Sequence, residues 1–302
     1  MYFSGGRLRA GRRDGRLVTD LPAVRQVVPH LMPTRLEATV YYRQHLDVEH
    51  LMEWLAEVNE GRDPAERVRF FHVFLTALAR VYRLRPELNR FVSGRRTYEH
   101  RDITFSFTVK QAMTDEAPDV QAHLTFTGTE TVEEVRAKVE RGLDGLRDGA
   151  HADTDTLIDA LVRLPRPVVA GIARTAWTLD ALNLLPGVLQ EAVPVYASAY
   201  LVNLGSLGAE APFHHLYQRG TASIFASIGT IRPEPVVDAA GSVVARRRVD
   251  VVYTIDERAT DGFYLVRSAD LLQDLIDDPA GLMHPPAPAG QTGEPEQTRS
   301  TP

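Results

Sequence analysis

The sequence contains no cysteine in its 302 residues. Disulfide bonds, thiolate catalysis and cysteine-ligated metal sites are therefore excluded, and we expect a cytoplasmic protein because this composition suits a reducing compartment. Long hydrophobic runs are also absent. The arginine-rich start has no apolar core of the kind found in a secretory signal. The most apolar stretch, residues 168–182, is interrupted by Arg174 and Asp180 and is too short for a transmembrane span.

The overall charge is acidic, with a formal net charge of −6. We therefore expect no nucleic-acid partner, which would require a strongly basic surface. Hydrophobic residues make up 44% and charged residues 25% of the chain, which is ordinary for a globular protein with a substantial core.

Both ends of the chain differ in composition from the middle. Residues 1–20 form an arginine-rich arm, and residues 280–302 are rich in Pro, Gly, Gln, Glu and Thr. Neither end can bury much apolar surface, so we expect both to be disordered. The sequence then predicts one domain over residues 21–279, with no internal repeat.

Within this domain, period-two and period-3.6 apolar patterns alternate irregularly. Helices are expected over 48–58, from Asp63-Pro64 to 85, and over 132–146, where Thr131 and Glu134 have capping-box spacing; Asp47 is expected to cap the first of them. Strands are expected over 37–47, 91–98, 103–110, 120–127, 195–204, 222–231 and, after a hairpin at Ala240-Gly241, 249–255. This order is not a regular βαβ alternation, so we expect an α/β (α+β) two-layer sandwich with a mixed sheet.

Residues 151–194 form a helical insertion bounded by prolines, with helices expected over 157–162 and 168–182. Three interpretations remain open for it. It can be an amphipathic lid or apolar wall for a substrate, a pair of ordinary core helices, or a membrane-surface element, of which the last is the least favoured.

Residues Asp256 to Gly262 lie where an alternating run ends and a helical pattern over 263–276 begins. A period of two that changes to 3.6 indicates a strand-to-helix corner. This corner places charged side chains at an edge of the fold, which is a common setting for chemistry.

Several stretches, taken in order, resemble a known family. In chain order these stretches are Val28-Pro29-His30, residues 85–89, residues 102–105, Val202-Asn203-Leu204-Gly205, residues 223–229 and Asp256 to Gly262. Together they resemble the catalytic domain of dihydrolipoyl acyltransferases of 2-oxo-acid dehydrogenase complexes and the related chloramphenicol acetyltransferases. The resemblance covers about residues 28 to 278 except the 151–194 insertion. We identify no lipoyl or peripheral-subunit-binding domain, so swinging-arm chemistry is not implied.

The resemblance implies a chloramphenicol-acetyltransferase-like fold, a homotrimer with sites between subunits, and coenzyme A as thioester co-substrate, with no tightly bound cofactor. The base of the family is the histidine that opens a His-x-x-x-Asp-Gly motif. Here Asp261 and Gly262 match, but Glu257 stands at the histidine position. In the family, a Ser-Asn-Leu-Gly turn supplies a serine that resembles the oxyanion donor. Here Val202 stands at the position of that serine, beside Asn203 and Gly205.

The candidate residues leave alternatives open. Glu257 is either a substitute base or the partner of an arginine such as Arg258. His214 and His215 either supply an imidazole or lie at the surface, and the pair without further ligand spacing predicts no metal site. His30 either lines an acceptor channel or packs.

Three functions follow from these alternatives. The first is a stand-alone acyltransferase with a substituted active site, acting on a small, lipophilic acceptor. The second is a non-catalytic trimeric binding or scaffold protein that kept the fold. The third is proton abstraction by Glu257 without acyl transfer.

Overall fold

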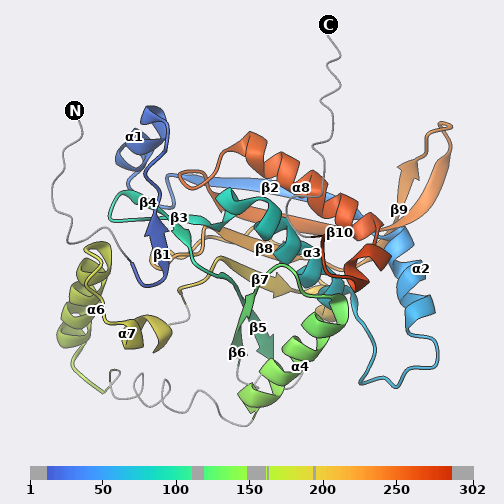
Figure 1. Ribbon diagram of the computed structural model, residues 1–302, viewed down its shortest axis with the longest axis horizontal. Helices are drawn as coiled ribbons and strands as arrows, with labels where there is room; N and C mark the ends of the chain where they lie inside the picture. Colours follow the sequence, from blue (N-terminus) through green and yellow to red (C-terminus); the bar gives the residue numbers. More distant parts are fainter. Residues whose placement is uncertain (1–11, 111–118, 148–160, 162, 193–194, 288–302) are drawn as a thin grey trace, which may run out of the picture.

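A seven-stranded mixed sheet is the centre of the computed structural model, which describes residues 12–110, 119–147, 161, 163–192 and 195–287 (Figure 1). Only the pairs β5–β7 and β7–β8 are parallel. In sheet order the strands are β2 (Thr39–Asp47), β10 (Val243–Asp256), β8 (Ile224–Ile228), β7 (Ala199–Asn203), β5 (Ile103–Lys110) and β6 (Asp119–Phe126), and β9 (Arg232–Val237) pairs with the start of β10.

One face of this sheet is covered by helices, as Figure 1 shows. Because side chains alternate along a strand, Val251, Tyr253 and Ile255 of β10 point into the helical layer and are buried. The expected two-layer α/β architecture is thus confirmed. The covering helices are α2 (Glu49–Val58), α3 (Phe70–Leu84), α4 (Val132–Arg147) and α8 (Gly262–Asp277).

The opposite face, called here the open face, is crossed by the chain between β7 and β8. A small apolar cluster lies under this crossing segment and contains Tyr200, Leu216 and Phe225. The segment begins with the short 3₁₀ helix η3 (Gly205–Leu207).

A separate three-stranded sheet flanks the main one. It consists of β1 (Gly15–Leu17), β4 (Arg96–His100) and β3 (Arg90–Ser93), which follows the 3₁₀ helix η2 (Pro86–Asn89). The single strand expected over 91–98 is therefore a hairpin. The chain reverses at Gly94 and Arg95, both of which have positive φ.

The N-terminal boundary of the fold was predicted wrongly. Residues 15–17 pair with β4, and Arg12 is only 4% exposed because it contacts Asp14 and Asp180. The expectation of a disordered arm rested on its low apolar content, whereas Arg12 is buried because two carboxylates compensate its charge. After β1, the helix α1 (Ala23–Leu31) contacts β4 of the three-stranded sheet. Residues 1–11 are outside the described part of the chain.

The C-terminal boundary also lies further on than residue 279. The 3₁₀ helix η4 (Ala280–Met283) buries Leu282 completely, and Arg80 donates a hydrogen bond to the carbonyl of His284. Residues 288–302 of the expected tail are outside the described residues.

Two helices of the insertion are described: α6 (Arg166–Ala181) and α7 (Gly187–Ala192). The helix expected over 157–162 falls almost entirely outside the described residues. In α6 only Asp180 is buried, so the interpretation as a core helix is wrong for this element. Among the described residues, no helix has the length and apolar character needed to cross a membrane.

Local sequence signals predicted some helix ends correctly and others wrongly. Thr131 and Glu134 form the expected capping box, with reciprocal backbone hydrogen bonds. The helix expected from Asp63 begins only at Phe70, because Asn59 hydrogen-bonds the backbone of Val68 in both directions and holds a loop there. Asp47 lies one residue before the N-cap of α2, although its carboxylate accepts from the Glu49 N–H.

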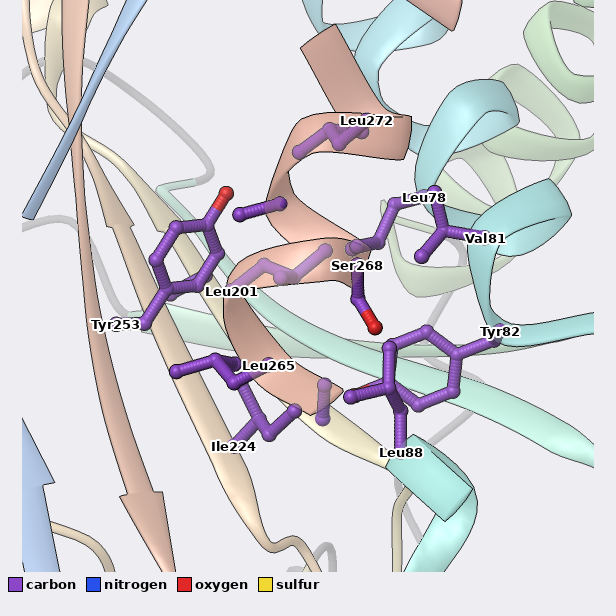
Figure 2. A pocket seen from close by; sticks show the side chains of 13 residues that line it. Leu78, Val81, Tyr82, Leu88, Leu201, Ile224, Tyr253, Leu265, Ser268 and Leu272 are labelled. Atoms are coloured by element: carbon purple, nitrogen blue, oxygen red, sulfur yellow. The ribbon is translucent and has the colours of Figure 1, made fainter. Parts of the chain in front are cut away.

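Figure 2 shows an apolar cavity between the sheet and the helices α3 and α8. Its volume is about 30 Å³, and Tyr82, Leu201, Tyr253 and Leu265 are among its lining residues. That space holds about two water molecules and no acyl group or acceptor. The cavity lies on the helical side of the sheet, so it is separate from the residues that the sequence marks as a site.

Candidate functional site

The strand-to-helix corner exists as expected. β10 ends at Asp256, and α8 begins at Gly262. Asp261 is the N-cap of α8, where its carboxylate accepts a hydrogen bond from the Tyr264 N–H at 2.8 Å. Arg25 of α1 reaches the same carboxylate at 3.3 Å. Asp261 thus orients the corner, and nothing in its contacts gives it a chemical role.

A buried charge cluster lies directly under the corner. Asp256 is fully buried and accepts from Arg258 with both carboxylate oxygens, at 2.8 and 2.7 Å. Arg35, which is 2% exposed, lies 3.7 Å from the same carboxylate. Burial lowers the pKa of Arg35, and Asp256 opposes that shift. Arg35 remains charged because it also donates to the carbonyls of Tyr217, Gly220 and Ala222.

Glu257 is the half-buried residue between these two partners. Its backbone N–H donates to the Ala38 carbonyl and its own carbonyl accepts from Arg25. Its carboxylate has no hydrogen bond or ion pair with any residue that the structure describes. The expected alternative of a pair with Arg258 is wrong, because Arg258 is bound to Asp256.

His214 and His215 lie over the open face. The ring of His214 stacks on Phe225 at 4.0 Å and on His215 at 4.7 Å, and the Nδ1 atom of His214 contacts the His215 carbonyl at 2.8 Å. The hydroxyl of Thr254 donates to the carbonyl of His214. The two imidazoles are therefore held near the final residues of β10, but no contact joins either to Glu257 among the described residues.

His30 lies in the last turn of α1 and is exposed. The end of α1 contacts the corner, because the carbonyl of Met32, two residues after His30, accepts a hydrogen bond from Arg258. The role of His30 in acceptor binding stays a prediction.

The turn after β7 has the expected tight geometry. The Asn203 side chain accepts from the Gly205 N–H, and a Cβ at Gly205 would lie 2.8 Å from the Gly229 carbonyl oxygen. Glycine is therefore required there. Val202 points to the open face and packs against the apolar cluster that contains Tyr200 and Phe225.

The corner and this turn lie at opposite ends of the same sheet. The Asp256 N–H bonds the Ser223 carbonyl, whereas Val202 is paired with Ser227, four residues further along β8. Four residues correspond to about 13 Å at ~3.3 Å per residue. One chain therefore does not bring Glu257 and Val202 into a single site.

A polar depression of about 100 Å³ lies beside the turn end of the sheet. Asp250 of β10 is at its edge and accepts from the Nδ1 atom of His45 on β2, at 2.5 Å. A carboxylate held against one ring nitrogen fixes the orientation of the imidazole and of its other nitrogen. Arg232, bound to Glu210 and Glu234, supplies charge to the same depression.

Sequence reasoning missed His45–Asp250 and the Arg35–Asp256–Arg258 cluster. His45 and Asp250 are 205 positions apart, and only the antiparallel register of β2 with β10 places them opposite each other. Strict alternation in both strands predicts that each faces the open side. Without the strand pairing, that alternation does not say which residues meet.

A mixed sheet covered on one face, an open face crossed by a long segment, and an aspartate-capped corner together define a chloramphenicol-acetyltransferase-like α/β protein. The family of 2-oxoacid dehydrogenases acyltransferase (catalytic domain) matches residues 197–284, which include both the turn and the corner. The resemblance seen in the sequence is therefore confirmed: this part of the chain is similar to the acyltransferase catalytic domain, and solved structures of such domains share the fold.

Solved structures with the same fold cover most of the chain. A probable dihydrolipoamide acetyltransferase from Listeria monocytogenes 4b F2365 has a TM-score of 0.58 at 13% identity, over 86% of this chain and 94% of that one. The cubic core of a pyruvate dehydrogenase multienzyme complex has a TM-score of 0.58 at 13% identity, over 88% and 94%. A chloramphenicol acetyltransferase has a TM-score of 0.50 at 10% identity, over 87% and 99%. No curated protein matches the chain by sequence.

Proposed function

We propose that this protein is an acyltransferase that moves an acyl group from a coenzyme A or carrier thioester to a small acceptor, with Glu257 as its base. The observation that supports this role most directly is the unpaired carboxylate of Glu257. Its neighbours Asp256 and Arg258 neutralise each other, so Glu257 is left without a structural partner among the described residues. A carboxylate kept free at the corner is available to a substrate.

In the proposed reaction the acceptor attacks the thioester carbonyl carbon while Glu257 takes its proton. A new bond forms between acceptor and acyl carbon, the carbon–sulfur bond breaks, and the thiol leaves with a proton. A carboxylate has an ordinary pKa of about 4.3, so it is better suited to a thiol, enol or ammonium acceptor than to a sugar hydroxyl. Val202 offers no hydroxyl to the oxyanion, and losing such a donor costs roughly 2.7–4 kcal/mol of transition-state stabilisation.

We further propose that the active unit is a homotrimer with its sites between subunits. This is supported by the separation of the corner from the turn, since each chain has the two elements at opposite ends of its sheet. The corner of one subunit can then face the turn and the polar depression of the next. The open face is available for such a contact, because the helices α2, α3, α4 and α8 cover the other face of the main sheet (Figure 1).

A second candidate is a non-catalytic trimeric protein that kept the fold. It is favoured by Val202, whose side chain packs on the apolar cluster of the open face as a structural residue would. In that case the chain would assemble and bind small molecules or other chains without turning over a thioester.

The test measures thiol release from a panel of acyl-coenzyme A thioesters, with and without thiol and amine acceptors. Glu257→Gln should lower turnover by about 10² or more, while the fold and the oligomer persist. The matched control is Glu66→Gln, at an exposed glutamate in the loop before α3. Full activity of Glu257→Gln would remove Glu257 from the mechanism.

A gain-of-function variant separates the two candidates. Glu257→His with Val202→Ser restores the two groups that the resemblance implies for catalysis. If wild type is inactive and the double variant turns over acyl-coenzyme A as a trimer, the non-catalytic candidate is correct. If neither protein is active and neither binds coenzyme A by calorimetry, acyl transfer from coenzyme A is excluded.

A further inference from the structure

The imidazole ring of His214 is held on both of its faces. It stacks on Phe225 of β8 with the ring centroids 4.0 Å apart and the planes at 7°, and on His215 at 4.7 Å and 18°. The hydroxyl of Thr254 on β10 also donates to the backbone carbonyl of His214. The plane of this imidazole is therefore fixed, although the residue belongs to the segment that crosses the open face.

One hydrogen bond sets the tautomer of the same ring. The Nδ1 atom of His214 lies 2.8 Å from the carbonyl oxygen of His215, and a carbonyl oxygen can only accept. Nδ1 therefore carries the proton of the neutral ring, and Nε2 keeps a free lone pair. Nε2 has no hydrogen bond with any residue that the structure describes. Because His214 is half-buried, a base is held here on a rigid side chain that is partly open to solvent.

The neighbouring His215 is less constrained. It is exposed, and its ring contacts Tyr217 edge to face at 5.9 Å. No hydrogen bond within the described part of the chain determines which of its two ring nitrogens carries the proton. The two histidines, equivalent as candidates in the sequence, therefore differ in the structure, and His215 is a matched control for His214.

His214 and Glu257 lie at the same end of the main sheet. Phe225, on which His214 stacks, pairs with Thr254 of β10, and Thr254 is three residues before Glu257. Three residues correspond to about 10 Å at ~3.3 Å per residue. A small acceptor flanked by two side chains spans such a separation. The imidazole and the carboxylate can therefore both serve one acceptor.

The number of protons that the acceptor loses decides whether one base is enough. A thiol or an enol loses a single proton, which ends on the sulfur of the leaving thiol. An ammonium ion loses two. The first must leave before the nitrogen has a lone pair with which to attack, and the second leaves as the amide forms. Only the second ends on the sulfur, so the first requires a base of its own.

We propose that the acceptor is a primary amine, bound as its ammonium ion, and that His214 takes its first proton at Nε2. This inference rests on the acyl transfer proposed above. The nitrogen then attacks the thioester carbonyl carbon, the carbon–sulfur bond breaks, and Glu257 passes the second proton from nitrogen to sulfur. The imidazolium releases its proton to water. Imidazole is a stronger base than a carboxylate, and the face of Phe225 stabilises the charge that the ring gains.

The experiment compares benzylamine with benzyl thiol as acceptors from the panel of acyl-coenzyme A thioesters, with the amide and the new thioester detected separately. We expect the amide from wild type. His214→Gln should lower the rate of amide formation by about 10² or more and leave thioester exchange within about threefold of wild type. Thioester exchange by the same variant shows that it is folded. His215→Gln, at the other ring of the stack, should change neither rate.

Three results would overturn the proposal. The first is acylation of the thiol but not of the amine by wild type, and the second is equal amide formation by His214→Gln and His215→Gln. The third does not depend on turnover: NMR of the ring nitrogens, at a pH where His214 is neutral, would show the proton on Nε2, which leaves no lone pair there. Absence of transfer to either acceptor in wild type would instead overturn the acyl transfer itself, and this proposal with it.

Discussion

Arg258 holds the carboxylate of Asp256, two residues before it, with two hydrogen bonds of 2.8 and 2.7 Å. The residue between them, Glu257, is therefore left out of the buried charge cluster. Three consecutive residues therefore serve two purposes: Asp256 and Arg258 stabilise the corner through their buried ion pair, and Glu257 between them is the proposed base.

The first prediction concerns that cluster. Asp256→Asn would leave Arg35 and Arg258 buried without a counter-charge, which costs about 3–5 kcal/mol for a broken buried ion pair. Urea denaturation should show the corresponding loss in the free energy of unfolding. Glu66→Gln, at an exposed position, is the control and should stay within about 0.5 kcal/mol of wild type. A loss below about 1 kcal/mol in Asp256→Asn would mean that water compensates the arginines.

The second prediction separates the two contacts of Asp261. Asp261→Ala removes the N-cap of α8 and should cost about 1 kcal/mol of unfolding free energy. Asp261→Asn keeps an oxygen for the Tyr264 N–H and loses only the exposed pair with Arg25, so its cost should stay below about 0.5 kcal/mol. Equal costs for both variants would assign the stabilisation to the ion pair.

Much of the main sheet and its helices could be predicted from the sequence because both have strong periodic signals. The hairpin at Ala240-Gly241, the capping box at Thr131 and the corner at Asp256 to Gly262 all follow from local chemistry. The boundaries at the chain ends did not follow from it. Arg12 and Leu282 are buried by partners far away in the sequence, and composition alone describes neither contact.

The site was predictable only in part, for a related reason. The sequence marks Glu257 and Val202 as unusual, but the distance between them depends on the register of β7, β8 and β10. Arg258 was considered a partner of Glu257 because the two are adjacent. Neighbours in a chain need not face each other, and Arg258 turns instead to the fully buried Asp256.

The third prediction is a loss of stability in mild acid. Burial lowers the pKa of both His72 and His100 to about 4, from an ordinary value of 6.5. Both are neutral in the folded protein, whereas the unfolded chain binds protons as soon as the pH falls below 6.5. Stability contributed by the neutral rings is therefore complete above pH 6.5 and is lost as the pH falls towards 4, by up to about 3 kcal/mol for each.

His100→Gln isolates one of the two groups. Between pH 7 and pH 5 the free energy of unfolding of the variant should change by about 2 kcal/mol less than that of wild type. The absolute stability of the variant does not matter for this comparison, because the measured quantity is the dependence on pH. Parallel profiles for the two proteins would show that His100 is accessible to protons in the folded state.

The last prediction tests how α6 is attached. Arg12→Met leaves Asp14 and Asp180 without their shared arginine, so the last turn of α6 should separate from the small sheet while the main core stays folded. Hydrogen exchange should speed up over residues 166–181 and remain slow in α3. In a Trp54→Phe background, the emission of Trp177, a half-buried residue next to Arg219, should shift to longer wavelength. Arg16→Met, which removes a 71% exposed arginine side chain from the neighbouring strand, is the control and should change neither signal. Unchanged exchange in Arg12→Met would show that α6 is held in place by contacts other than these ion pairs.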